Sequence, residues 1–311
     1  MTAFYSPLTN KSLWSGRADA NTNEYIYQII QFLDLNNPAN DLNGYALLGF
    51  ECDAGVSRNQ GNPGASEGPN AFRSALAKFP IHKSLQLFDA GNVSCAGDNL
   101  EAAQLELSHQ INKIIACGLT PIVIGGGHET AWGHFQGLSH PNKDIAILNF
   151  DAHFDLRPLI NGQLGSSGTP FRQIHNFLTA DNKPFHYYCA GIQPFSNTKY
   201  LFDYAKKLNV SYELAETIHA NPYDMRFIDK IINRHEHLYV SICLDVFQAS
   251  LAPGVSAPQV LGISATYVIE ALKRLKNSGK VMSIDIVELA PKYDIRDQTA
   301  KLAATLLMNY L

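Results

Sequence analysis

Short apolar runs recur along the chain from Tyr45 onward, and polar or glycine-containing segments bound each of them. A run of four to eight apolar residues is typical of a strand buried on both faces, as in a parallel sheet. The clearest example is residues 145–150, which lie between Asp144 and a group of acidic residues. Eight runs predict strands, at residues 45–50, 85–88, 120–124, 145–150, 186–190, 211–214, 238–244 and 281–286.

Helical patterns separate several of these runs. Residues 100–117 and 266–277 carry apolar positions at helical spacing, and Gly118 and Gly279 mark their ends. Strands alternating with helices predict βαβ units and therefore a mostly parallel, eight-stranded sheet covered by helices on both faces. Eight strands would also permit a closed barrel, but the spacing does not favour closure.

The first 43 residues lack the alternation of strand and helix patterns. They are polar and irregular apart from a helix predicted at residues 24–33, so we interpret residues 1–43 as an N-terminal extension packed on the outside. No proline-rich, serine-rich or charged linker interrupts the remaining pattern. We therefore expect one domain over residues 1–311.

Composition narrows the function classes. Hydrophobic residues make up 46% and charged residues 17% of the chain, as in a soluble globular protein. The formal net charge of -4 gives no basic footprint, which argues against a nucleic-acid partner. No run is long enough to cross a bilayer, and the first sixteen residues hold no basic segment followed by an apolar core, so no membrane partner and a cytoplasmic location are expected. Five cysteines without paired spacing favour a reducing compartment.

Chemically active side chains follow the predicted strands. Ligands of open α/β sheets bind outside the carboxyl ends of the strands. Asp151, His153 and Asp155 follow the strand at 145–150, and in an extended backbone these alternate residues would point to one side. Cys243 and Asp245 repeat that spacing at the end of another strand.

Two further strand ends add His128 and Glu288. His128 follows Gly125–Gly127, whose three glycines allow a tight turn. The glycines lack the Lys and Ser or Thr of a phosphate-binding P-loop, so phosphate binding is the weaker interpretation. Any single carboxylate here could be a helix cap or a turn former. Carboxylates, imidazoles and a thiol from neighbouring strands together indicate a metal site.

The ordered motifs resemble those of the ureohydrolase superfamily, which includes arginase, agmatinase and formimidoylglutamase. They are Gly-Gly-Gly-His-Glu at 125–129, Asp-Ala-His-Phe-Asp at 151–155, Ser-Ile-Cys-Leu-Asp at 241–245, Pro-Gly-Val-Ser-Ala-Pro at 253–258 and Ile-Val-Glu at 286–288. The resemblance extends from about Tyr45 to the end of the chain. It implies a three-layer α/β/α sandwich, a site for two Mn²⁺ ions and a homo-oligomer.

The resemblance also implies ligands. His128, Asp151 and Asp155 would hold the first ion, and His153, Asp151 and Asp245 the second, with Asp151 bridging. Two ions about 3.5 to 4 Å apart can share a water and make it a hydroxide nucleophile near neutral pH. By the same resemblance, a catalytic Glu288 would pair with the amidine or guanidine cation of a small-molecule substrate.

Cys243 departs from the family pattern, which has a bridging aspartate there. A thiolate is softer and offers one donor atom, so the second ion would bind weakly or another metal would be preferred. The alternative is a buried free cysteine that leaves the ligand set one short. Cys52 follows another strand at the same edge, and a redox disulfide between Cys52 and Cys243 is a further hypothesis, which needs α-carbons within roughly 7 Å.

The segment after the acidic row resembles the formimidoylglutamase group in particular, at residues 155–158 and 166–173. Residues 14–17 and 55–59 support the same resemblance. It implies hydrolysis of N-formimino-L-glutamate to L-glutamate and formamide, a reaction of histidine degradation. This substrate carries two carboxylates and no free α-ammonium. Candidate groups for the carboxylates are Arg157 as a bidentate clamp, Arg172 as a second cation, and Ser167 and Thr169 as neutral donors.

Three questions stay open from the sequence. Asp155 is our candidate proton carrier, because Phe171 stands where arginase has a histidine that shuttles protons. Arg157 could instead form a surface salt bridge. Two rival functions remain. The protein could be another ureohydrolase of the arginase or agmatinase type, or a non-catalytic family member that binds little metal because Cys243 replaces the usual bridging aspartate.

Overall fold

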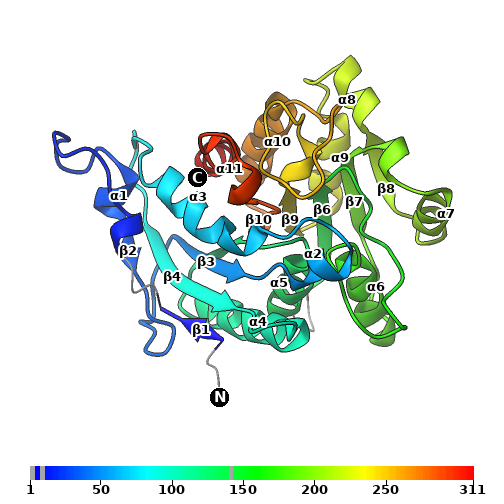
Figure 1. Ribbon diagram of the computed structural model, residues 1–311, viewed down its shortest axis with the longest axis horizontal. Coiled ribbons are helices and arrows are strands. Elements are labelled where there is room, and N and C mark those ends of the chain that lie inside the picture. The colour runs from blue at the N-terminus through cyan, green and yellow to red at the C-terminus, as the bar shows by residue number, and fades with distance from the viewer. Residues whose placement is uncertain (1–3, 8–10, 140–142) are drawn as a thin grey trace.

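The computed structural model describes residues 4–7, 11–139 and 143–311. Its centre is one ten-stranded sheet in the order β1-β4-β3-β5-β10-β9-β6-β7-β8, with β2 also beside β4 (Figure 1). All neighbours run parallel except β1 and β4. The strands are β1 Tyr5–Ser6, β2 Gln31–Phe32, β3 Tyr45–Glu51, β4 Leu87–Ser94, β5 Thr120–Ile124, β6 Ile145–Phe150, β7 Tyr187–Ile192, β8 Ser211–Leu214, β9 His237–Cys243 and β10 Val281–Val287.

Helices cover both faces of the sheet and bury a separate apolar core on each side (Figure 1). This arrangement confirms the predicted three-layer α/β/α sandwich. One layer contains α3 Gly68–Leu76, α8 Ala215–Ala220, α9 Arg226–Arg234, α10 Ala265–Ser278 and α11 Gln298–Tyr310. The other contains α4 Leu100–Ala116, α5 Thr130–Leu138, α6 Pro170–Ala180 and α7 Lys199–Lys207. The short elements are α1 Ile26–Ile29, α2 Ala54–Arg58, η1 Lys11–Leu13, η2 Ala65–Glu67, η3 Pro194–Ser196, η4 Leu244–Val246 and η5 Pro291–Tyr293.

The strand prediction was wrong about β4. Residues 85–88 were predicted as a strand because they are apolar, but β4 begins at Leu87 and continues to Ser94 through the polar Asp89 and Asn92. Both side chains are buried because Arg73 of α3 pairs with them, through two bonds of 2.8 and 2.9 Å to Asp89 and one of 2.7 Å to Asn92. Hydropathy does not reveal polar groups that are satisfied by a distant partner.

The N-terminal extension differs from its prediction as well. In place of a helix over residues 24–33, α1 covers only Ile26–Ile29, and Gln31–Phe32 pairs with β4. Backbone pairing with an exposed sheet edge has replaced further helical turns. Trp14 donates from Nε1 to Asp89 Oδ2 at 2.7 Å, which ties the extension to the buried polar group of β4. The extension therefore adds two short strands to the eight that were predicted.

The strand order decides where chemistry can occur. β5, β10, β9 and β6 are consecutive neighbours in the middle of the sheet, although they lie far apart in the sequence. Their carboxyl ends therefore meet at one edge, as the parallel-sheet prediction required. Among the described residues, no helix combines the length and the apolar character that a membrane span requires.

Candidate metal centre

The turn after β5 brings His128 to the sheet edge. Gly126 donates its backbone N–H to Phe50 and Gly127 donates to Cys52, so the turn lies against the end of β3. A Cβ at Gly126 would lie 1.7 Å from the carbonyl oxygen of Cys52. Only glycine fits there, because any side chain would push the turn away from β3 and His128 with it.

The acidic row after β6 converges by a different route from the predicted one. We expected an extended backbone through Asp155, but the chain bends directly after Phe150 and Asp155 has a left-handed φ of 47°. The N–H of His153 donates to Asp151 Oδ1 at 2.8 Å, which fixes the bend. The three side chains still share one site, because the bend and not strand alternation turns them inward.

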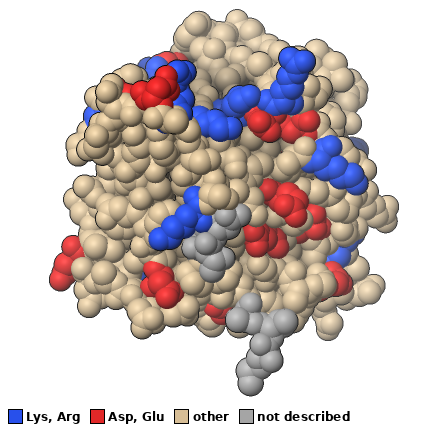
Figure 2. Space-filling view, turned by 60° about the vertical axis from the view of Figure 1, so that its left-hand side comes forward, with Lys and Arg blue, Asp and Glu red and all other residues tan. Residues whose placement is uncertain are grey.

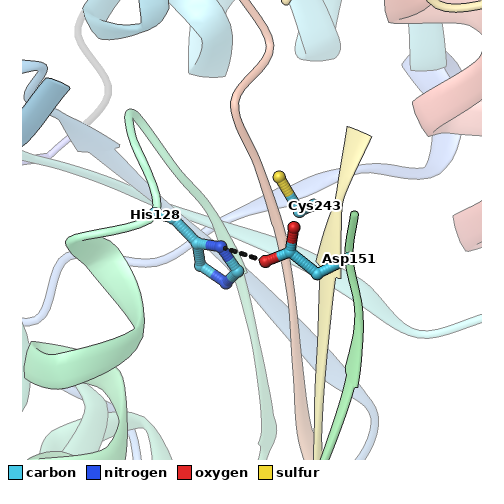
Figure 3. A group of neighbouring side chains, drawn as sticks. All are labelled: His128, Asp151 and Cys243. Atoms are coloured by element: carbon cyan, nitrogen blue, oxygen red, sulfur yellow. Dashed lines mark ion pairs between the residues drawn. The ribbon is translucent and has the colours of Figure 1, made fainter. Parts of the chain in front are cut away.

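Two groups of potential ligands share Asp151. In the first, His128 Nδ1 lies 3.0 Å from Asp151 Oδ2 and 2.9 Å from Asp155 Oδ2, and the Cys243 sulfur lies within the same cluster (Figure 3). In the second, His153 Nδ1 lies 3.4 Å from Asp151 Oδ1 and 3.3 Å from Asp245 Oδ2. Asp245 comes from η4, which follows β9. One carboxylate between two ligand groups is the arrangement of a two-ion site.

The donor atoms fit cations at both places. His128 Nδ1 and Asp245 Oδ1 are buried and have no hydrogen-bond partner within the described part of the chain, although each faces other donors of the two groups. Buried polar atoms are normally satisfied, so such orphans indicate a missing ligand. Imidazole nitrogens and carboxylate oxygens together suit Mn²⁺ and similar divalent ions.

Electrostatics within the site show the same demand for positive charge. Burial would lower the pKa of His128 and of His153, but the neighbouring carboxylates outweigh it and raise both pKa values well above the ordinary value. Burial would raise the pKa of Asp151, yet the two imidazoles lower it. Burial and the charge of Asp151 raise the pKa of Asp155. Without ions, protons on the imidazoles neutralise the carboxylates.

A second layer of residues orients His128. Its Nε2 lies 2.9 Å from Ser241 Oγ, and Ser241 donates in turn to Asp285 Oδ1 at 2.5 Å. Asp285 also accepts hydrogen bonds from Tyr239 and lies 2.7 Å from His134 Nδ1. Such contacts fix the ring so that its other nitrogen faces Asp151 and Asp155. The sequence motifs included Ser241 without giving it a role, and neither Asp285 nor His134 was singled out from the sequence.

Phe171 packs against the same imidazole. Its ring contacts His128 edge to face at 5.3 Å between centroids and stacks on Tyr187 at 4.4 Å. The side chain is fully buried. Phe171 therefore holds the His128 ring in place by packing. Its hydrocarbon ring cannot accept or donate a proton, so it cannot act as a proton shuttle.

Cys243 ends β9 with its sulfur near Asp151 (Figure 3). Burial, followed by the charges of Asp151, Asp245 and Glu288, raises the pKa of its thiol, so it is protonated in the absence of ions. All five cysteines are free, and the thiol of Cys52 contacts Cys95. Because β5 and β10 separate β3 from β9, the α-carbons of Cys52 and Cys243 are about three strand spacings, roughly 14 Å, apart. The sheet order thus argues against the predicted redox pair.

A cavity of about 190 Å³ opens onto the ligand groups. Arg157 and Ser167 line it, as predicted, together with Val56, Asn59 and Gly61 of the rim formed after β3. Arg157 is exposed and makes no ion pair with any described residue, so the alternative of a surface salt bridge is not what the structure contains. Its guanidinium remains available to an anionic ligand.

Glu288 closes the cavity on the side of β10. It has a left-handed φ of 68°, a strained backbone that is commonly retained at functional sites. Its carboxylate accepts hydrogen bonds from the N–H of His128 at 2.8 Å and from Ser256 Oγ at 2.6 Å. Burial raises its pKa to about 7. Glu129, which sequence reasoning left without a role, is buried beside it and accepts the N–H of Gly55 at 2.8 Å, holding the rim in place.

The structure places two predicted substrate ligands elsewhere. Thr169 precedes α6, and its hydroxyl bonds within its own turn to the backbone of Ser166 and to Gln173. Arg172 stacks on the Tyr204 ring at 4.2 Å and donates to Tyr200. Neither residue lines the cavity, because the Thr169 hydroxyl is used in the turn before α6 and the Arg172 guanidinium is packed against Tyr204.

Comparisons with known proteins identify the family of the chain. The model of the arginase family matches residues 43–311. Formimidoylglutamase of Legionella pneumophila (strain Lens) is 44% identical over 99% of this chain and 97% of its own length. Formimidoylglutamase of Clostridium tetani is 39% identical over 99% of this chain and 95% of its own length.

Solved structures show the same fold. The crystal structure of formimidoylglutamase from Bacillus subtilis has a TM-score of 0.82 at 24% identity, covering 94% of both chains. Trypanosoma cruzi formiminoglutamase, crystallised with Mn²⁺, has a TM-score of 0.78 at 25% identity, covering 86% of this chain and 91% of that one.

Proposed function

The chain belongs to the arginase family, and we propose that it hydrolyses N-formimino-L-glutamate to L-glutamate and formamide in the degradation of histidine. The observation that carries the proposal is the pair of ligand groups sharing Asp151 beside a cavity with an unpaired Arg157. The formimidoylglutamases that align with nearly the whole chain support this substrate over arginine or agmatine.

Two Mn²⁺ ions are the cofactor that we propose. His128, Asp151 and Asp155, with Cys243 beside them, would hold one ion, and Asp151, His153 and Asp245 the other. When bound, such ions would lower the pKa of a water and so supply a nucleophile near neutral pH. The orphaned atoms of His128 and Asp245 support this assignment.

The chain's own residues bind and orient the substrate. Arg157 forms a two-pronged contact with a glutamate carboxylate at the cavity mouth, and Ser167 donates to the same end. Glu288 faces the amidine cation, held in position by His128 N–H and Ser256. Water adds to the formimino carbon, the bond to the α-nitrogen breaks, and formamide leaves. Asp155 carries the proton to the departing nitrogen, since Phe171 has none to give.

Replacing Arg157 tests the substrate assignment. We expect Arg157→Met to raise KM for N-formimino-L-glutamate by about 30-fold or more, because one charged hydrogen-bonding pair contributes roughly 2 kcal/mol. Formamide release measures the effect. Arg172→Met is the matched control and should leave KM within about twofold, as Arg172 lies outside the cavity. Equal losses in both variants, or urea release from arginine or agmatine by the unmodified protein, would refute the assignment.

Cys243→Asp tests the departure from the family pattern. An added carboxylate at this position offers a hard oxygen donor next to Asp151, so we expect Mn²⁺ affinity at the weaker site to rise at least about tenfold. Cys243→Ala distinguishes a metal-bound thiolate from a buried free cysteine. The variant should bind Mn²⁺ more weakly if the thiolate is a ligand, and with unchanged affinity if the cysteine is only buried. Mn²⁺ titration under reducing conditions measures both. Fewer than two bound ions and no formamide release in the unmodified protein would favour the non-catalytic alternative.

Cellular context follows from the same features. We propose a cytoplasmic homo-oligomer with a small-molecule substrate, a setting supported by the five free thiols and the family. The face in Figure 2 carries Lys and Arg interspersed with Asp and Glu, which does not resemble the basic surface of a nucleic-acid-binding protein.

A further inference from the structure

A third group of potential metal ligands lies where the strands begin, at the opposite ends of the strands from the two catalytic groups. Asp144 directly precedes β6, His186 directly precedes β7, and His235 follows α9 two residues before β9. Because β9, β6 and β7 are consecutive neighbours, their amino ends bring the three residues together. The six residues of β6 separate this group from Asp151 by roughly 20 Å, so it is not part of the catalytic centre.

The spacing of the three side chains suits one ion. One donor atom from each residue lies within 4.8 Å of the other two, the same limit that the two catalytic groups meet. His186 Nε2 lies 3.2 Å from Asp144 Oδ2. Ligand atoms around a tetrahedral Zn²⁺ with bonds of about 2.0 Å lie about 3.3 Å apart, so this separation is already that of two ligands. The imidazole rings of His186 and His235 approach to 4.7 Å between centroids.

The surroundings orient His235 and leave His186 accessible to an ion. His235 is buried, with 5% of its surface exposed, and its Nε2 meets the Tyr188 hydroxyl at 2.8 Å, which fixes the ring as outer contacts do for metal-bound histidines. The charged neighbours of His235 include Asp144, Arg234 and Lys280. His186 lines a cavity of about 450 Å³, which gives an ion access.

We propose that Asp144, His186 and His235 form a binding site for a borderline divalent cation of the Zn²⁺ class. Two imidazoles and one carboxylate are the donor set that such ions prefer, and water from the cavity completes the coordination. The neighbouring Arg234 and Lys280 weaken the site relative to the catalytic groups, which hold more carboxylates. The ion would link the amino ends of the neighbouring strands β9, β6 and β7.

The competing interpretation is a simple ion pair between a protonated His186 and Asp144. That pair needs neither His235 nor a metal. An ion at the three-residue group, in contrast, requires both imidazoles at once. Replacing either histidine therefore separates the two interpretations.

The test uses full-length protein with its catalytic ions in place. Crystals grown with excess Mn²⁺ are soaked in Zn²⁺, and anomalous difference maps are recorded on both sides of the zinc edge. We expect a zinc peak within bonding distance of all three residues, absent in His186→Asn and in His235→Asn. His175→Asn is the matched control, because His175 lines the same cavity outside the group, and it should keep the peak.

Solution measurement gives the second readout. With Mn²⁺ in excess, the unmodified protein and His175→Asn should each bind one more Zn²⁺ per chain than His186→Asn, as counted by mass spectrometry of the metal. Zinc confined to the catalytic groups, or a peak at the third group that persists in His186→Asn, would overturn the proposal.

Discussion

The variant Asp151→Asn is expected to lose formamide release by roughly 1,000-fold or more, which corresponds to about 4 kcal/mol of transition-state stabilisation. Asp151 is the only carboxylate that lies in both catalytic ligand groups of the described chain, so its loss weakens both ions together. Mn²⁺ content should fall in parallel with activity. Mass spectrometry of the metal and an assay of formamide measure the two effects.

The control for Asp151→Asn is Asp203→Asn. Asp203 pairs with Lys199 on the surface of α7, where one exposed ion pair contributes little. This variant should retain activity and metal content. A native circular dichroism spectrum of Asp151→Asn must accompany the loss of metal. Full Mn²⁺ content in Asp151→Asn would contradict the shared-ligand geometry.

The variant Glu288→Gln is expected to lose at least about 100-fold in kcat/KM while it keeps both ions. Glu288 lies beside the ligand groups and faces the cavity, and its replacement removes the negative charge that pairs with the amidine cation. A buried charged pair contributes roughly 3 kcal/mol when one partner is removed. Kinetics of formamide release and metal counting on the same sample distinguish this loss from that of Asp151→Asn.

Glu213→Gln is the matched control for Glu288→Gln. Glu213 is partly buried and, like Glu288, accepts a hydrogen bond from a hydroxyl, that of Tyr267, but it lies on β8, away from the cavity. The Glu213→Gln variant should keep kcat/KM within about twofold of the value for the unmodified protein. If Glu288→Gln released its metal, Glu288 would act on the ions and not on the substrate.

The interior of the fold was predictable because its strands are mostly apolar. β5 and β6 have the predicted bounds, since their residues are almost all apolar and buried. β8 also has the predicted bounds, although none of its residues is fully buried and it contains Ser211 and Glu213. β4 was mispredicted because Arg73 satisfies buried polar groups from 16 residues away. A partner at that distance leaves no trace in local hydropathy.

The clustering of the candidate ligands was predictable, and the residues around them were less so. His128, Asp151 and Asp245 follow strand ends, where topology alone brings them together. Arg172 was misplaced because its direction depends on the rotation of α6 about its own axis, which residue spacing does not determine. His134 was missed because a histidine in a helix has no signal until its contact with Asp285 is seen.

The two short strands of the N-terminal extension have a further consequence. β2 pairs with Phe88 and Asp89, and β1 pairs with Asn92 and Val93, so together they occupy most of the outer edge of β4. An unpaired edge strand is a template on which other chains aggregate. A protein shortened to the part that the family shares would expose that template, and its yield and shelf life in solution would suffer before its catalysis did.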